Sequence, residues 1–263
     1  MNSTLKVSSI ALDIVHGDKN VNLLAAEHAI ASLPADNDVV VLPEFFSTGF
    51  ISDKEELAEV AEPGSGRTMQ LIAELARCYN MAICGTFAAR VAHQFFNRGF
   101  FVEPSGEEIF YDKRHLFGLS PEVKTYRGGE MPMPIVRFRG WNIALMICYD
   151  LRFPVWSRNV DNAYDVLLVP ANWPKVRSYA WEHLLIARAI ENQAYVVGAN
   201  RSGKDAHCNY DNLTYILDYL GQHIGKTVIG SSVVTATLSY DALSTVRSNF
   251  PVSADADRFR IDL

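Results

Sequence analysis

The sequence lacks the features that mark several broad classes of protein. No apolar run is long enough to span a membrane, and the opening MNSTLKVSSIALDI has no basic stretch followed by a long apolar one, so we expect neither a membrane span nor a signal peptide. No cluster of Lys and Arg offsets the formal net charge of -6, which argues against nonspecific nucleic-acid binding. The P-loop and GxSxG patterns are absent as well. With 49% hydrophobic and 21% charged residues, the chain has the composition of a soluble globular protein.

Cysteine is also scarce, and its spacing excludes further classes. The four cysteines form neither a CxxC pair nor a zinc-type pattern, so we expect no metal site and a reduced, cytoplasmic setting. Cys78 falls in a helical stripe and Cys84 in an apolar strand, which predicts that both are buried, whereas Cys208 falls in a loop. None of the histidines that a metal site or a Cys–His protease would use has suitable spacing to a second ligand: His115, His183 and His207.

Hydrophobic periodicity predicts alternating strands and helices. Strands are expected over Leu5–Ile14, Val39–Leu42, Met81–Phe87, Phe95–Val102, Glu108–Tyr111, Ile135–Phe138, Trp141–Ile147, Val166–Val169, Ala194–Ala199, Leu213–Tyr219 and Thr227–Leu238. Helices are expected over Asn20–Ser32, Gly64–Asn80, Pro154–Asn159 and Ser178–Asn192. Leu116 to Met133 is expected to be a long loop, and the tail after Phe250 has little apolar periodicity. This order predicts a single α/β domain over residues 1–263, with helices outside mixed sheets.

Three reactive side chains follow predicted strands at the point where each strand ends. Glu44 follows one buried strand, Lys113 follows the strand that ends at Tyr111, and Cys148 follows the strand that ends at Ile147. Because strand ends at one edge of a sheet can converge, the three can share a site. A carboxylate beside a thiol takes its proton, and an ammonium stabilises the thiolate and then the oxyanion of a tetrahedral intermediate. Taken singly, each residue is more often structural: a core cysteine, a loop carboxylate or a solvated lysine.

Around these residues the sequence resembles the nitrilase superfamily of carbon–nitrogen hydrolases. The matching segments are LPEFFSTGF (42–50), YDKRHLF (111–117), ICYDLRFPVWSR (147–158), VPANWP (169–174) and ARAIENQAYVVGANR (187–201). They occur in the family's order and span nearly the whole chain, which makes the resemblance specific. It implies a four-layer α/β/β/α sandwich, a homodimer that packs through helices, and no cofactor.

The resemblance also implies roles for individual residues. The family's Glu-Lys-Cys triad carries over onto Glu44, Lys113 and Cys148. A second glutamate of the family follows the lysine within the long loop, and Glu122 in SPEVKTYRGG occupies that place, where it would orient Lys113 and the substrate. Glu130 is the competing assignment, but Glu122 keeps the family's spacing to the glycine pair that closes the loop.

The residues after the nucleophile indicate a branch of the family. The run CYDLRF from Cys148 to Phe153 is similar to the amidase branches, whereas family nitrilases carry Trp-Glu there and carbamoylases a double-arginine version. The branch it most resembles is that of the ω-amidases, which hydrolyse 2-oxoglutaramate and related dicarboxylate monoamides. NYDNL at 209–213 departs from the usual small Gly/Ser pattern and leaves substrate preference open. Another family amidase, a nitrilase, a carbamoylase and a non-catalytic binding protein on this scaffold stay as alternatives.

Substrate contacts are predicted from the chemistry of such a substrate. A dicarboxylate monoamide presents a carboxylate at its far end, and arginine binds carboxylates through bidentate hydrogen bonds. Arg177 is the candidate for this contact, with Phe46 and Trp173 as aromatic walls and the backbone N–H of Tyr149 as an oxyanion donor. The competing interpretation of Arg177 is a surface charge at the start of the next helix. Arg152 is expected to be structural and to pair with a buried acid.

Overall fold

Two β-sheets packed face to face form the centre of the protein, seen here in a computed structural model that describes residues 3–227 and 232–262. The first sheet has the order β13-β14-β1-β2-β3-β4-β5, with strands β1 (Thr4–Ile10), β2 (Val39–Val41), β3 (Ala82–Val91), β4 (Gln94–Val102), β5 (Glu108–Asp112), β13 (Lys226–Thr227) and β14 (Val233–Ser239). The second has the order β12-β9-β8-β7-β6, with strands β6 (Ile135–Phe138), β7 (Trp141–Leu145), β8 (Val166–Ala171), β9 (Tyr195–Asn200) and β12 (Tyr215–Leu217). A separate two-stranded ribbon consists of β10 (Gly203–Lys204) and β11 (Asn209–Tyr210).

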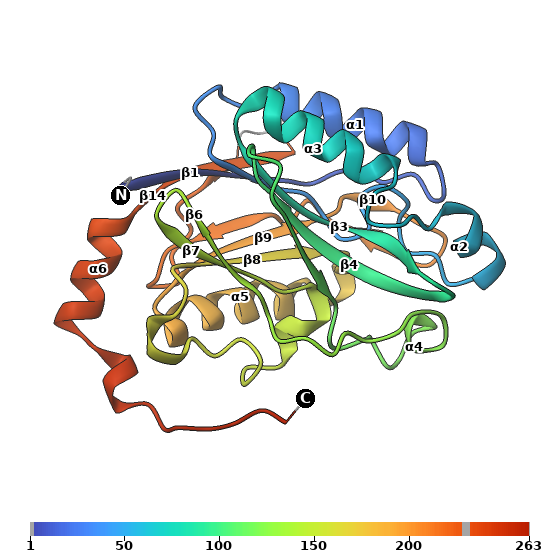
Figure 1. The fold of residues 1–263 in the computed structure, drawn as a ribbon. Coiled ribbons are helices and arrows are strands. Elements are labelled where there is room, and N and C mark those ends of the chain that lie inside the picture. The colour runs from blue at the N-terminus through green and yellow to red at the C-terminus, as the bar shows by residue number, and fades with distance from the viewer. Residues whose placement is uncertain (1–2, 228–231, 263) are drawn as a thin grey trace.

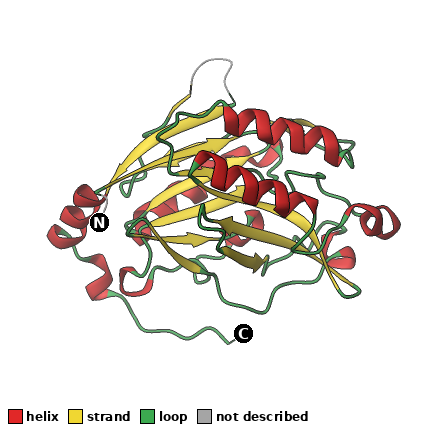
Figure 2. Ribbon diagram, turned by 45° about the horizontal axis from the view of Figure 1, so that its top comes forward, coloured by secondary structure: helices red, strands yellow, loops and turns green. Residues whose placement is uncertain are grey.

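Helices cover the outer face of each sheet. Helices α1 (Lys19–Ala31) and α3 (Arg67–Tyr79) lie side by side over the first sheet, and α5 (Ser178–Asn192) lies over the second (Figures 1 and 2). The predicted four-layer α/β/β/α sandwich is therefore confirmed. The shorter helices are α2 (Lys54–Val60), α4 (Glu122–Thr125), α6 (Tyr240–Asn249) and the 3₁₀ helices η1 (Cys148–Arg152), η2 (Val160–Asn162), η3 (Lys175–Arg177) and η4 (Val252–Asp255). Across residues 3–227 and 232–262, no helix has the length and apolar content needed to cross a membrane.

Strand alternation explains how the layers hold together. In β2, Val39 and Val41 belong to the core between the two sheets, while Val40 belongs to the core beneath α1 and α3. Successive side chains of a strand point to opposite faces, so an uninterrupted apolar run is what a strand covered on both faces requires. Strands β1, β2 and β3 run parallel to one another in the first sheet, and β7, β8 and β9 do so in the second. Within each sheet, the residues that follow these strands therefore leave at the same edge.

Most of the predicted elements are present within a few residues of their expected bounds, and the helix Ser178–Asn192 is confirmed in full. The helix expected over Pro154–Asn159 is wrong, because that segment is a turn between η1 and η2. Proline restricts the residue before it to extended conformations, and Phe153 is extended here, which separates the turn from η1. The loop Leu116–Met133 contains the single turn α4. Within the predicted strand Thr227–Leu238, residues 228–231 lie outside the described residues.

Candidate active site

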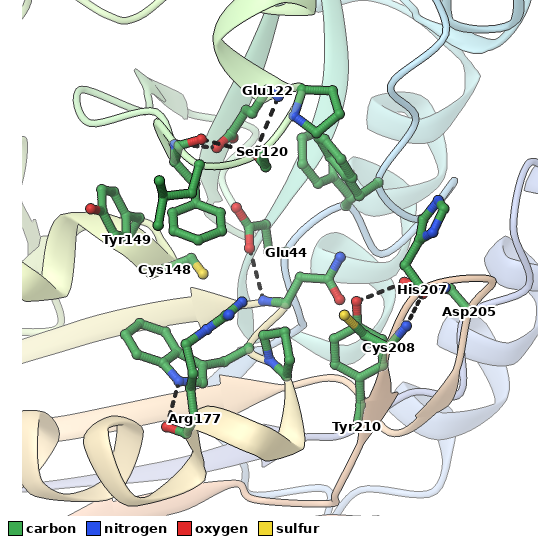
Figure 3. Close-up of a pocket in the computed structure, with 18 of the residues that line it drawn as sticks. Glu44, Ser120, Glu122, Cys148, Tyr149, Arg177, Asp205, His207, Cys208 and Tyr210 are labelled. Atoms are coloured by element: carbon green, nitrogen blue, oxygen red, sulfur yellow. Dashed lines mark hydrogen bonds between the residues drawn. The ribbon is translucent and has the colours of Figure 1, made fainter.

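The predicted catalytic residues Glu44, Lys113, Glu122 and Cys148 line one cavity of about 260 Å³. Glu44 follows β2, Lys113 follows β5 directly, and Cys148 opens the 3₁₀ helix η1 after β7. The sheets come together here, since the Glu44 N–H donates to the Ala171 carbonyl at the end of β8 at 3.3 Å. Figure 3 shows the Glu44 carboxylate and the Cys148 sulfur facing the same space. Convergence of strand ends, which the sequence only suggests, is present.

Lys113 lies between two carboxylates. Its Nζ is 2.9 Å from Glu44 Oε1 and 2.9 Å and 3.1 Å from the two oxygens of Glu122. All three side chains are buried. Burial by itself lowers the pKa of Lys113, but the charges of Glu122 and Glu44 outweigh that effect, and the pKa lies well above its usual value. Lys113 is therefore a fixed cation at neutral pH, suited to stabilise negative charge and unsuited to accept a proton.

Further donors complete the coordination of the two carboxylates. Asn97 Nδ2 donates to Glu44 Oε1 at 2.6 Å, and the main-chain N–H of Asn172 donates to Glu44 Oε2 at 2.8 Å. Glu122 Oε2 accepts the N–H of Phe117 at 2.7 Å. Buried charges are tolerated only when such partners satisfy them, so the cluster is a preorganised unit.

Cys148 occupies a left-handed turn at the end of β7. Its φ of 43° is a conformation that residues with side chains rarely adopt. The Cys148 sulfur and the Glu44 carboxylate face the same space (Figure 3). Burial and the negative charge of Glu44 raise the pKa of the Cys148 thiol well above its usual value, against the opposing effect of Lys113. A protonated thiol needs a proton acceptor in order to react, and Glu44 is placed to be one.

Asp150, which sequence analysis did not single out, stabilises the turn at Cys148 through hydrogen bonds. Its fully buried carboxylate accepts the Ile147 N–H at 3.1 Å and the Tyr111 hydroxyl at 2.9 Å. It also accepts the His115 N–H at 2.9 Å and lies 2.8 Å from His115 Nδ1. Residues beside Cys148 and residues on either side of Lys113 are therefore tied to one carboxylate. His115 accordingly has a structural partner, as expected.

Two arginines also line the cavity. The guanidinium of Arg177 lies 5.0 Å from the centre of the Phe117 ring, and that of Arg152 lies 4.8 Å from the centre of the Trp173 ring. Among the described residues, neither guanidinium has a carboxylate partner, so the expectation that Arg152 pairs with a buried acid is wrong. Arginine stacks well on aromatic rings, which holds the guanidinium plane while leaving its N–H groups available. Arg177 faces the cavity as its predicted role requires (Figure 3).

The aromatic walls differ in part from prediction. Trp173 lines the cavity as expected, but Phe46 does not: its side chain is fully buried against Phe100 in the core beneath the helices. Phe45 and Phe50 line the cavity in its place. Val40 and Leu42 belong to the same core as Phe46, so Phe46 keeps the alternation of the preceding strand and points beneath the helices. Its neighbour Phe45, which has a left-handed φ of 52°, faces the cavity instead.

Tyr149 and the ribbon β10-β11 complete the lining. The Tyr149 ring packs against Phe117 with centroids 5.0 Å apart, and its N–H lies in the first turn of η1, where N–H groups have no acceptor within the helix. The unusual NYDNL segment forms part of the ribbon, and its Tyr210 lines the cavity. Asp211 of the same segment forms an ion pair with Lys175 at 3.1 Å, which links the chain beside the ribbon to η3, the 3₁₀ helix that ends at Arg177.

Other candidates lie apart from this cluster. Glu130, the alternative to Glu122, is exposed and forms an ion pair with Arg127. Cys84 is buried as predicted, but Cys78 is exposed, because α3 turns other residues towards the sheet. Cys208 lies in the loop between β10 and β11, as predicted, and lines the cavity. In the part of the chain that the structure describes, no three His, Cys, Asp or Glu side chains are grouped so as to hold a metal ion.

The arrangement is that of a nucleophilic thiol with an adjacent base and a fixed cation, and comparisons with known proteins define its family. The profile of the Carbon-nitrogen hydrolase family matches residues 6–248. The omega-amidase YafV of Escherichia coli (strain K12) is 39% identical over 98% of this chain and 98% of its own length. The 2-oxoglutaramate amidase of Bacillus subtilis (strain 168) is 30% identical over 95% of this chain and 96% of its own.

A solved structure is similar to this chain in both fold and sequence. XC1258 from Xanthomonas campestris, a CN-hydrolase superfamily protein with an arsenic adduct in its active site, superposes with a TM-score of 0.90 at 36% identity and covers 98% of this chain and 99% of its own. The chain therefore belongs to the carbon–nitrogen hydrolase family, and the resemblance to the nitrilase superfamily is confirmed.

Proposed function

We propose that this protein is a thiol-dependent amidase that hydrolyses the terminal amide of small dicarboxylate monoamides such as 2-oxoglutaramate to the acid and ammonia. One observation carries the proposal. The same cavity is lined by the buried Glu44–Lys113–Cys148 cluster and by Arg177, an arginine with no carboxylate partner among the described residues. The similarity to an omega-amidase and to a 2-oxoglutaramate amidase supports the same substrate class.

The first half of the reaction forms a thioester. The Cys148 sulfur attacks the amide carbonyl while its proton passes to Glu44. Lys113 Nζ and the Tyr149 N–H hold the oxyanion that develops on the carbonyl oxygen. A single N–H of Lys113 can serve both oxygens of Glu122, which leaves one N–H for the substrate. Glu44 then returns its proton to the nitrogen as the C–N bond breaks, and ammonia departs.

The second half of the reaction consumes water. Glu44 takes a proton from a water molecule, whose oxygen adds to the thioester carbonyl. The same donors hold the second oxyanion, the C–S bond breaks, and the sulfur regains its proton from Glu44. Glu44 alternates between base and acid, as it must when one carboxylate serves both half-reactions. Glu122 keeps Lys113 in place throughout.

The substrate carboxylate binds to Arg177 in this proposal. Its guanidinium offers paired N–H donors, and Trp173 and Phe45 enclose the short carbon chain between the two ends. Arg152 provides a second positive charge in the lining of the same cavity. A substrate with an amide at one end and a carboxylate at the other fits this distribution of charge.

We also propose that residues 1–263 act as one domain, that the protein is cytoplasmic, and that it forms a homodimer through its helices. Tyr179 and Ile190 of α5 are 75% and 51% exposed and Leu220 is 54% exposed, so the outer layer carries exposed apolar side chains. The four cysteines are free, as a reducing compartment requires. Sedimentation of the full chain tests the dimer: a sedimenting mass of one chain at micromolar concentration would contradict it.

Ammonia release from a panel of amides, nitriles and carbamoyl compounds tests the activity. We expect 2-oxoglutaramate to be the preferred substrate and mass spectrometry to find an acyl group on Cys148 after rapid quenching. Cys148→Ala should lose activity by on the order of 10⁴-fold or more, the scale of nucleophile removal in other hydrolases. A Cys148→Ala protein with full activity would end the proposal, and preference for a nitrile or carbamoyl compound would redirect it within the family.

A further inference from the structure

A buried asparagine connects the members of the catalytic cluster. Asn97 lies in the middle of β4, in the aromatic-rich run QFFNRGFFV, and is 0% exposed. Its Nδ2 donates to Glu44 Oε1 at 2.6 Å and lies 3.5 Å from Glu122 Oε1. Its main-chain carbonyl accepts the Lys113 N–H at 2.9 Å. One residue thus contacts three members of the cluster, and it does so without lining the cavity.

The hydrogen bonds of Glu44 show what this contact accomplishes. A carboxylate offers about four acceptor positions, two on each oxygen. Both positions of Oε1 are occupied, by Lys113 Nζ and Asn97 Nδ2, and one position of Oε2 is occupied by the Asn172 N–H. A single position on Oε2 remains, and the Cys148 sulfur faces this carboxylate (Figure 3). The three fixed donors therefore hold the carboxylate with one position left open on Oε2, the oxygen that would receive the proton of the thiol.

The charge of the cluster explains why this donor is an amide. Two carboxylates and one ammonium, all buried, carry a net charge of about -1 when ionised, and the carboxylates repel each other. An amide N–H stabilises the carboxylates without adding a second cation, which would compete with the thiol proton for Glu44. The amide orientation follows from chemistry, since both neighbouring atoms are carboxylate oxygens that only accept.

We infer that Asn97 is a positioning residue for Glu44. It touches neither substrate nor thiol, and it acts by holding the proton-accepting oxygen in line with Cys148. This inference rests on the proposed role of Glu44 as the base, and the two are separated by experiment.

Alkylation of Cys148 by iodoacetamide, a small neutral reagent, measures activation of the thiol without substrate binding. Site-resolved mass spectrometry keeps Cys148 apart from the exposed Cys78. Asn97→Leu, which has a similar volume but no donor, should slow alkylation and lower kcat by about 10- to 100-fold, as residues that orient active-site groups do, with KM nearly unchanged. The matched control is Asn37→Leu, because Asn37 is 1% exposed and bonds Ser8 and the Val39 carbonyl at the far end of β2.

Two other substitutions keep the inference testable if Asn97→Leu does not fold. Asn97→Ser retains a hydroxyl donor and should lose less activity than a variant without one. Asn97→Asp places a third carboxylate beside Glu44, so it should be nearly inactive at neutral pH. Its activity relative to the native protein should rise as the pH falls, because the introduced group then gains a proton that it can donate to Glu44. A role confined to folding would leave the shape of that pH profile unchanged.

The outcomes distinguish the inference from the proposed function. Glu44→Gln is measured first, and unchanged alkylation there would overturn the role of Glu44 itself. If Glu44→Gln slows alkylation but Asn97→Leu matches Asn37→Leu in rate and kcat per folded protein, the inference about Asn97 alone is overturned.

Discussion

The cavity is lined by positive charges that are held in two different ways. Lys113 is 3% exposed and forms hydrogen bonds with Glu44 and Glu122. Arg152 and Arg177 instead lie over aromatic rings, with no carboxylate partner in the described part of the chain. In the proposed function, Lys113 stabilises the oxyanion of any amide, whereas Arg177 binds the carboxylate of one class of substrate. The proposal thus assigns the reaction and the selectivity to different cations.

Removing the catalytic cation should have the largest effect. Lys113→Met leaves two buried carboxylates facing each other, so we expect a loss of about 3–5 kcal/mol in the free energy of unfolding, as for other broken buried pairs. Loss of its contact with the oxyanion should also lower kcat by about 10²–10³-fold. Chemical denaturation and ammonia release measure the two effects.

The control is an exposed ion pair. Lys6 bonds Asp36 at 2.6 Å on the surface, and Lys6→Met should cost less than about 1 kcal/mol. Native stability in Lys113→Met would show that the buried cluster does not need its cation.

Removing the binding cation should have a smaller and more selective effect. Arg177→Ala should lower kcat/KM for 2-oxoglutaramate by about 10- to 100-fold, the range of hydrogen bonds to a charged group, because the substrate carboxylate loses its partner. A simple aliphatic amide such as propionamide should react at an unchanged rate. Arg177→Lys should fall between, since it keeps the charge but not the bidentate geometry. Equal losses on both amides would contradict carboxylate binding by Arg177.

A lysine–carboxylate pair outside the cavity gives the smallest effect. Lys19 bonds Glu62 at 2.8 Å. Burial raises the pKa of Glu62, but hydrogen bonds from Lys19 and Thr68 outweigh it and lower the pKa below its usual value. A lowered native pKa gives stability that is present above the unfolded value of about 4.3 and is lost as the pH falls through the native value. The Tm deficit of Glu62→Gln at pH 7 should therefore shrink as the pH is lowered towards acid.

Glu59→Gln is the control for this measurement, because it removes the same charge from an exposed position of α2. A Tm deficit of Glu62→Gln that stays constant down to acid pH would contradict the assignment of its stability to the ionised carboxylate.

Sequence patterns predicted the elements that bury an apolar face and missed those that do not. Helices α2 and α6 each bury little, with Leu57 and Leu243 as their buried residues, so apolar periodicity gave no signal. Capping residues would have served better. Asp53 caps α2 by accepting the Glu56 N–H, and Ser239 caps α6 by accepting the Ala242 N–H, both at the spacing that marks helix starts.

The residues of the site were likewise predictable only in part. Reactive residues at strand ends were predictable, because strand ends of one sheet meet at a common edge. The partners were not: Asn97 reaches the cluster only through packing of segments far apart in the sequence, and Asp150, although two residues from Cys148, bonds Tyr111 and His115 of a distant segment. An asparagine within a predicted strand was nevertheless a usable signal, because a fully buried amide demands a polar partner. The alternation of Val40, Leu42 and Phe46 was a usable signal too, since it directs Phe46 into the core beneath the helices and not into the cavity.

The left-handed turn at Cys148 restricts the evolutionary choices open to this enzyme. Unbranched side chains tolerate a φ of 43° with modest strain, but a β-branched side chain at such an angle collides with its own backbone. Serine is therefore a permitted replacement on conformational grounds, and threonine is not. A descendant of this chain that exchanges the sulfur for a hydroxyl while keeping the turn would therefore carry a primary alcohol there and not a secondary one.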